Sequence, residues 1–149
     1  MNVSGTYLIH ADPAAVWRAV HDVDVLRETL PDCERLEQTA PDTFTGAARV
    51  GFSVIKGTYN GTVRLLEERE PEFLRISVEA RSSHAEIKGE GSLAFEATDE
   101  GSRVTYSGDA RVFGPIAAVG QRLIPSAAKT LSERFFQNLD RKLSKHGID

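Results

Sequence analysis

The side chains best suited to chemistry in this chain are four histidines, one cysteine and three tyrosines. The histidines, at positions 10, 21, 84 and 146, lack the short spacing that metal ligands need. Cys33 stands alone, so an internal disulfide is excluded and no cysteine-based metal motif is available. No Gly-x-Ser-x-Gly elbow is present to carry a serine nucleophile. The sequence therefore gives no positive sign of metal-dependent or nucleophilic catalysis, and no metal site is expected.

Two glycine-containing segments invite comparison with phosphate-binding loops, but each departs from the pattern that this chemistry needs. Residues 56–61, Lys-Gly-Thr-Tyr-Asn-Gly, reverse the Gly-Lys order of a phosphate loop, and strand residues follow directly. Residues 89–91, Gly-Glu-Gly, lack the third glycine and the following helix of a dinucleotide-binding fingerprint. We therefore expect no cofactor. Tyr59, Tyr106 and Arg122 remain as the polar groups expected near an interior binding space.

A strand-rich body and one long helix must position these side chains. Asp12 and Pro13 form a helix start, and Asp22 can cap a second short helix that Pro31 ends. A helical period follows from about 115 to 145, with Pro125 inside it as a predicted kink. Period-two patterns predict strands over 3–10, 33–39, 43–53, 57–68, 73–81, 84–97 and 102–112. Short connections make the strands antiparallel neighbours, so we predict an α+β helix-grip fold: a curved seven-stranded sheet around a long C-terminal helix.

Length and charge bound the class of protein. A chain of 149 residues with 40% hydrophobic and 27% charged residues is expected to form a single domain over 1–149. No apolar run is long enough to span a bilayer and no signal peptide is recognised, so a cytoplasmic protein is expected. Residues 1–110 carry 11 Lys or Arg against 19 Asp or Glu, a balance of −8, whereas residues 111–149 carry 7 against 3, a balance of +4.

The predicted C-terminal helix is thus a basic element on an acidic body. A solvated outer face explains this pattern, and so does docking to an acidic partner or to an anionic membrane surface. Nucleic acid is not expected as a partner, because the acidic body would repel phosphates.

Small residues dominate the strand faces that should point towards the helix. Alternation places Gly46, Ala48, Ala80, Gly89, Gly91, Gly108 and Ala110 inside the sheet. Glycine and alanine cannot fill the roughly 10 Å between a sheet and its covering layer. Either these glycines serve bulges and bends, with large neighbours filling the gap, or they line an apolar cavity.

The expected cavity lining combines the inward strand residues with the inner face of the helix. Its predicted ligand-binding residues are Phe44, Ala48, Val50, Phe52, Tyr59, Val63, Leu74, Ile76, Val78, Ile87, Gly89, Gly91, Val104, Tyr106, Gly108, Val119, Gly120, Leu123 and Ala127.

Several segments, taken in order, resemble the carbon monoxide dehydrogenase G-subunit family, a branch of the START-like (Bet v 1-like, SRPBCC) superfamily. They are Pro31-Asp32-Cys33, 56–63, 89–91, 112–122 and Phe135-Phe136. The resemblance implies a helix-grip fold with a deep hydrophobic cavity and no established catalytic residues. It also implies an accessory role beside a molybdenum-containing carbon monoxide dehydrogenase or related hydroxylase, in membrane recruitment or in handling a quinone-like molecule.

Two departures from the family pattern qualify this expectation. The usual Pro-Gly is Pro31-Asp32 in this chain. Some members carry a C-terminal extension that reaches the membrane, whereas this sequence ends at Asp149, so direct anchoring is not expected.

Three functional hypotheses follow from these patterns. The first is a noncatalytic protein that binds an apolar small molecule, a quinone or a lipid, in the cytoplasm or peripherally at the inner face of the membrane. The second is a cyclase- or hydratase-type enzyme, which would need an acid–base pair such as Tyr106 with a carboxylate or His10 in the cavity. The third is a protein-interaction module that docks through the basic helix.

Overall fold

The computed structural model describes residues 2–51 and 55–147. All the predicted strands and helices are present, with small shifts at their ends. The elements are β1 (Asn2–Ile9), α1 (Pro13–His21), α2 (Val23–Thr29), β2 (Cys33–Ala40), β3 (Thr43–Val50), β4 (Gly57–Arg69), β5 (Phe73–Arg81), β6 (Glu86–Thr98), β7 (Gly101–Phe113) and α3 (Ala117–Gly147).

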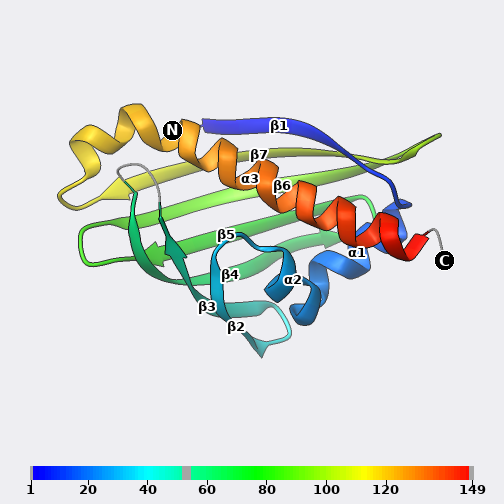
Figure 1. Cartoon of the computed structure of the whole chain (residues 1–149), viewed down its shortest axis with the longest axis horizontal. Coiled ribbons are helices and arrows are strands. Elements are labelled where there is room, and N and C mark those ends of the chain that lie inside the picture. Colours follow the sequence, from blue (N-terminus) through cyan, green and yellow to red (C-terminus); the bar gives the residue numbers. More distant parts are fainter. Residues whose placement is uncertain (1, 52–54, 148–149) are drawn as a thin grey trace.

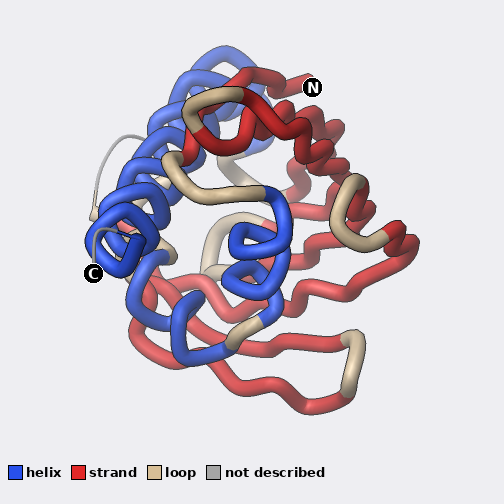
Figure 2. The backbone as a smooth tube through the Cα atoms, turned by 90° about the vertical axis from the view of Figure 1, so that its right-hand side faces the viewer, coloured by secondary structure: helices blue, strands red, loops and turns tan. Residues whose placement is uncertain are grey.

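The seven strands form one antiparallel sheet in the order β1-β7-β6-β5-β4-β3-β2. β2 to β7 follow one another as a meander, and β1 adds to the free edge of β7. Figure 2 shows the strands forming an arc with the three helices on its concave side. α3 runs along β1 and β7, and α1 and α2 lie near its C-terminal end (Figure 1). The arrangement confirms the predicted helix-grip fold.

The two short helices form where their capping residues direct. Asp12 accepts a hydrogen bond from the Ala15 amide at 2.8 Å, and Pro13 occupies the first turn of α1. Asp22 ends α1 and caps α2, because its carboxylate accepts from the amide of Asp24 at 2.9 Å. The inner face of α1, including the fully buried Val16, packs into the core.

Polar contacts fix the C-terminal half of α3 to the rest of the fold. The Asn138 amide donates to the Thr29 carbonyl at 3.0 Å, and the Asp140 carboxylate accepts from the His10 amide at 2.8 Å. Two ion pairs join the same half to the α2 region: Arg134 with Asp32 and Lys142 with Glu28.

One residue of the predicted inner face of α3 points elsewhere. Leu123 is 43% exposed, and Ile124 takes the buried position at this turn. Neighbouring helical residues differ by about 100° in direction, and both are apolar, so the pattern alone did not choose between them. Pro125 lies inside α3, and the ribbon bends in this part of the helix (Figure 1). The predicted inward orientation of Leu123 is therefore corrected to Ile124.

Candidate functional site

The apolar interior is divided into two clusters. The first cluster lies towards α1 and contains Trp17, Phe95, Val104 and Phe136 among its buried members. The second cluster lies around the first half of α3 and contains Val50, Ile55, Tyr59, Ala85, Ile124 and Ala127. Contact clusters of this kind usually form one main core with smaller satellites, and the second cluster is the smaller of the two.

A band of small residues crosses the concave face of the sheet between these clusters. We call it the small-residue band; it comprises Val63, Val78, Gly89, Gly91, Gly108 and Ala110. Register places Val63 opposite Val78, Val78 opposite Gly89, and Gly89 opposite Ala110, in one row from β4 to β7. Val63, Val78 and Ala110 belong to neither cluster, and every band residue keeps partial exposure. The band is therefore a part of the concave face that lies outside both described clusters.

Two glycines of the band, Gly108 and Gly91, differ in their surroundings from the other glycines on this face. A β-carbon at Gly108 would lie 3.5 Å from the Glu90 carbonyl oxygen and 3.8 Å from the Gly91 Cα, and beyond its chain neighbours it would meet no other described atom within 4 Å. A β-carbon at Gly91 would meet only atoms of β7, the nearest being the Ser107 carbonyl oxygen at 3.1 Å. No described atom of α3 is among the nearest neighbours of either position.

Other glycines on the same face have a different cause. A β-carbon at Gly46 would lie only 2.2 Å from the Arg35 carbonyl oxygen, where the β2–β3 register shifts. At Gly89 the corresponding distance to the Asp109 carbonyl oxygen is 2.8 Å. Glycine is required there by close backbone approach. The explanation by backbone bends and close approach thus holds at Gly46 and Gly89, and the apolar cavity stays a prediction.

Most of the predicted site residues within the described part of the chain are buried or half-buried. Six are buried in the two clusters or at their borders, namely Phe44, Val50, Leu74, Val104, Tyr106 and Ala127, and Tyr59 is buried in the second. Ile76 and Ile87 pack partly buried against them, and Ala48 is half-buried on β3. Phe52 and the side chains at Val119 and Gly120 lie outside the described residues.

Sequence reasoning missed several residues on the same face. Alternation along β4 already places Gly61 and Leu65 beside Tyr59 and Val63, so the signal for them was present. Ile124 and Phe136 had no such signal, because α3 offers two adjacent apolar residues at each of those turns.

Two tyrosines are the titratable side chains among the described buried residues. Burial raises the pKa of Tyr106, and the charge of Glu133 adds to this, while its ring stacks on Phe136 at 5.3 Å. Burial also raises the pKa of Tyr59, although Ser82 acts weakly in the opposite direction. Both phenols are therefore neutral at neutral pH, and neither is a phenolate that could act as a base.

Tyr59 differs from the usual buried tyrosine. Its side chain is only 7% exposed, and its hydroxyl has no hydrogen-bond partner among the described residues. Ser82 is close enough to influence the pKa but does not meet hydrogen-bond geometry. An unpaired buried hydroxyl costs free energy, on the order of 1–3 kcal/mol. This is the one described buried side-chain atom left in that state.

His10 does not face the interior. Its ring is half-exposed and pairs with the Asp140 carboxylate at 3.0 Å, at the end of β1. The acid–base pair that an enzyme would draw from Tyr106 and His10 is therefore not assembled in the space over the band.

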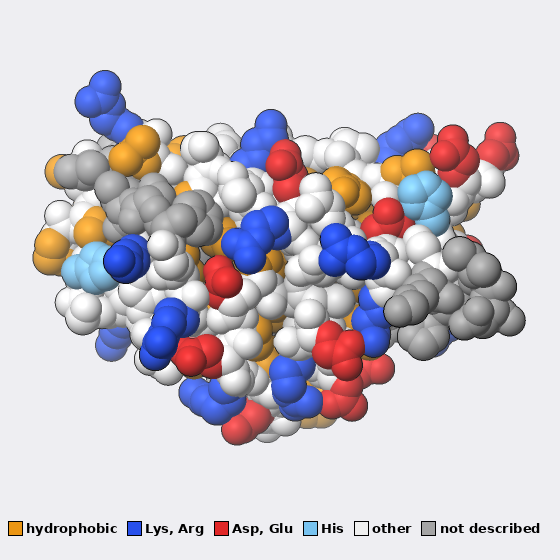
Figure 3. All heavy atoms as spheres, in the orientation of Figure 1, with side chains coloured by type: hydrophobic (Ala, Val, Ile, Leu, Met, Phe, Trp, Pro, Cys, Tyr) orange, Lys and Arg blue, Asp and Glu red, His pale blue; other side chains and the backbone are white. Residues whose placement is uncertain are grey.

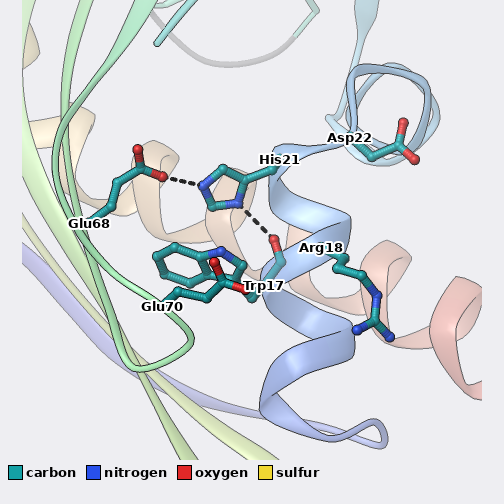
Figure 4. A pocket seen from close by; sticks show the side chains of 6 residues that line it. All are labelled: Trp17, Arg18, His21, Asp22, Glu68 and Glu70. Atoms are coloured by element: carbon teal, nitrogen blue, oxygen red, sulfur yellow. Dashed lines mark hydrogen bonds and ion pairs between the residues drawn. The ribbon is translucent and has the colours of Figure 1, made fainter. Parts of the chain in front are cut away.

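A separate hollow of about 670 Å³ opens on the surface between α1 and the β4–β5 turn (Figure 4). His21 faces it from α1, with Nδ1 2.7 Å from the Trp17 carbonyl oxygen and Nε2 2.6 Å from Glu68 Oε1. Each ring nitrogen thus faces an accepting oxygen. Arg18, Asp22 and Glu70 complete the lining with mixed charge. The hollow lies between α1 and the end of β4, and its charged lining differs from the apolar clusters of the interior.

Two further features concern metals and membranes. Within residues 2–51 and 55–147, no three His, Cys, Asp or Glu side chains are grouped to hold a metal ion. No helix in the same part of the chain combines the length and apolar character that crossing a membrane requires.

Comparisons with known proteins agree with this geometry. A conserved protein from Geobacillus kaustophilus shares the fold with a TM-score of 0.91 and 25% identity, over 97% of this chain and 96% of that one. A Mycobacterium smegmatis protein has a TM-score of 0.74 at 14% identity, over 97% of this chain and 92% of its own. A Chromobacterium violaceum protein has a TM-score of 0.72 at 13% identity, over 94% and 95%. At these lower identities the likeness shows the fold alone.

No curated protein matches the chain in sequence. The signature of the carbon monoxide dehydrogenase G-subunit (CoxG) matches residues 5–144, which is nearly the whole length and includes every strand but the start of β1. The fold, the order of its elements and this match agree, and the chain belongs to the carbon monoxide dehydrogenase G-subunit (CoxG) family.

Proposed function

We propose that this protein is a noncatalytic binding protein for an apolar small molecule of the quinone or lipid type. The observation that supports this most directly is the divided core, with the small-residue band between its two clusters. Packed interiors do not normally leave a row of apolar residues partly exposed beneath a covering helix. A ligand lying over the band would join the two clusters into one.

The expected gain from such binding is moderate. Burying about 300 Å² of apolar ligand surface contributes on the order of 7 kcal/mol before the costs of ordering the ligand and side chains. Dissociation constants from about 10 μM upwards are therefore expected for small probes. A longer natural ligand would bury more surface and bind more tightly.

Membership of the CoxG family suggests an accessory role for a carbon monoxide dehydrogenase. We infer that the bound molecule serves a molybdenum-containing enzyme of this type, either in handling its electron acceptor or in bringing it to the membrane. A soluble carrier suits this role, because a quinone or lipid needs shielding from water on the way.

The first half of α3 supports a docking role. Arg134 and Lys142 pair with acidic groups of the same chain, whereas no ion pair is formed by Arg122 or Lys129 within the described residues. Leu123 lies beside Arg122 with 43% exposure. Figure 3 shows exposed hydrophobic and basic side chains gathered at the end of the molecule that carries the start of α3. This surface suits a negatively charged partner, either an enzyme or the inner face of a membrane.

The cyclase- or hydratase-type alternative is less well supported. It needs a proton acceptor inside the space, and the described buried titratable groups are two neutral tyrosines. A binding function needs no such acceptor.

The test is equilibrium dialysis with 2,3-dimethyl-1,4-naphthoquinone, whose methyl groups block the ring positions that would otherwise alkylate Cys33. Wild-type protein should bind it, and Gly108→Leu should weaken binding at least tenfold by filling the space. Gly51→Leu is the matched control, because Gly51 is exposed and a β-carbon there meets nothing within 4 Å. Equal binding by the Gly108→Leu and wild-type proteins would contradict the proposed location.

A further inference from the structure

The hydroxyl of Tyr59 is the one described buried side-chain atom without a hydrogen-bond partner. Along β4, Tyr59 shares its face with Gly61 and Val63, and Val63 belongs to the small-residue band. Gly61 leaves the adjoining position without a side chain, and it keeps partial exposure. The border between the second cluster and the space therefore carries one phenol among hydrocarbon side chains.

The surroundings of this hydroxyl limit what it can bind. Its described polar neighbour is Ser82, and the apolar side chains of the second cluster that pack with Tyr59 are Val50, Ile55, Ala85, Ile124 and Ala127, with Ala80, Ile87, Val112, Ile116 and Leu131 packed against them. A charged ligand group buried among such side chains would lose its hydration without an opposite charge in return. An uncharged acceptor loses little and gains the hydrogen bond that the hydroxyl lacks.

We propose that the Tyr59 hydroxyl is the hydrogen-bond donor that fixes the polar end of the bound molecule. The ligand class follows: a largely hydrocarbon body carrying an uncharged acceptor, such as a quinone or ester carbonyl, with that carbonyl directed towards the second cluster. Ionised fatty acids do not fit this environment. This inference rests on the proposed binding function and adds an orientation and a selectivity to it.

Ser82 offers the competing account of the same hydroxyl. It is half-buried near Tyr59, and a small rotation would let the two side chains bond to each other. In that case the tyrosine would be a structural residue. The two accounts predict different effects of removing either hydroxyl, so they can be separated.

The experiment compares two probes of the same shape, 2,3-dimethyl-1,4-naphthoquinone and 2,3-dimethylnaphthalene, which differ in the two carbonyl oxygens. Tyr59→Phe should weaken quinone binding by roughly three- to tenfold, the effect of one hydrogen bond, and leave hydrocarbon binding unchanged. Ser82→Ala should leave both affinities unchanged. Tyr7→Phe, the same chemical change on β1 outside the space, is the matched control.

Each outcome decides between the accounts. If Tyr59→Phe weakens both probes equally, or neither, the hydrogen bond to the ligand is refuted while the binding function stands. If Ser82→Ala has the same effect as Tyr59→Phe on stability without ligand, the structural account is correct. Tighter binding of ionised 2-naphthoate than of the quinone would overturn the ligand class. If wild-type protein binds neither probe, the binding function itself fails, and this inference fails with it.

Discussion

If the volume above Gly108 is open, Gly108→Leu should raise the free energy of unfolding. If that volume is filled, the substitution should lower it. The β-carbon of the new side chain meets two backbone atoms of β6 at 3.5 and 3.8 Å, both ordinary contacts, and no described atom of α3. Full burial of a leucine side chain contributes about 1.5–3 kcal/mol, and the partly exposed site allows only part of this. Glycine in a strand interior also costs roughly 0.5–1 kcal/mol relative to alanine, which the substitution recovers.

Leucine loses about 0.5–1 kcal/mol of rotamer freedom on burial, so the expected net change is a gain of about 1 kcal/mol in the free energy of unfolding. For a chain of this length, that corresponds to a rise in Tm of about 2–4 °C. Urea denaturation followed by circular dichroism measures this change. The shift in midpoint reports it directly when wild-type and variant have the same m-value.

Gly46→Ala is the internal contrast for this prediction. Its β-carbon would lie 2.2 Å from the Arg35 carbonyl oxygen, so the β2–β3 backbone has to move. Even this smaller addition should lower the free energy of unfolding by about 1–3 kcal/mol, the usual cost of overpacking. If Gly108→Leu instead destabilises the protein by a similar amount, the volume above the band is filled, and the reasoning from glycine geometry is refuted.

Two further predictions concern the attachment of α3 and its docking surface. Burial raises the pKa of Asp140, but hydrogen bonds from His10 and Ser144 outweigh it, so the pKa lies below the ordinary value of 3.8. The stability that the Asp140 carboxylate provides is complete above pH 3.8 and is lost as the pH falls through the folded pKa. Asp140→Asn should therefore lower the free energy of unfolding by about 1–2 kcal/mol at pH 7 and leave it unchanged at low pH, as measured by urea titrations. An equal decrease at both pH values would contradict this role. Arg122→Glu combined with Leu123→Ser should reduce cosedimentation with anionic vesicles severalfold, whereas Arg103→Glu at the opposite end of the sheet should not; an unchanged bound fraction would exclude membranes and leave an acidic enzyme surface to be tested in the same way.

The strand faces could be predicted from the sequence because antiparallel pairing leaves little choice. Val104, Tyr106 and Gly108 alternate with charged or polar neighbours on β7, and burying one set exposes the other. The starts of the two short helices could also be predicted, because Asp12 and Asp22 are recognisable in the sequence as helix-capping residues.

The space over the band could not be predicted with the same certainty. Gly46 and Gly108 are alike in sequence, yet a β-carbon at Gly46 would collide with the backbone of β2, whereas one at Gly108 would make only ordinary contacts with β6. The difference depends on the register shift in β2 and on the path of α3 along the sheet edge, which are tertiary features. The His21–Glu68 contact joins residues 47 apart and was likewise beyond sequence reasoning.

The fold also shows which basic residues of α3 are paired within the molecule. In the sequence α3 carries an excess of Lys and Arg, but Arg134 and Lys142 neutralise Asp32 and Glu28 of the same molecule. Within the described residues, Arg122 and Lys129 in the first half of the helix and Arg141 in the second half form no ion pair.

The most direct test of the binding function is native mass spectrometry of the protein and its Gly108→Leu variant, both purified from the cells that normally make it. Wild-type protein should carry an additional mass that organic extraction releases as an uncharged, carbonyl-bearing apolar molecule. The variant should carry little or none of it. Wild-type protein that stays bare even after incubation with a lipid extract of the same cells, or a variant that retains the same adduct, would contradict the account.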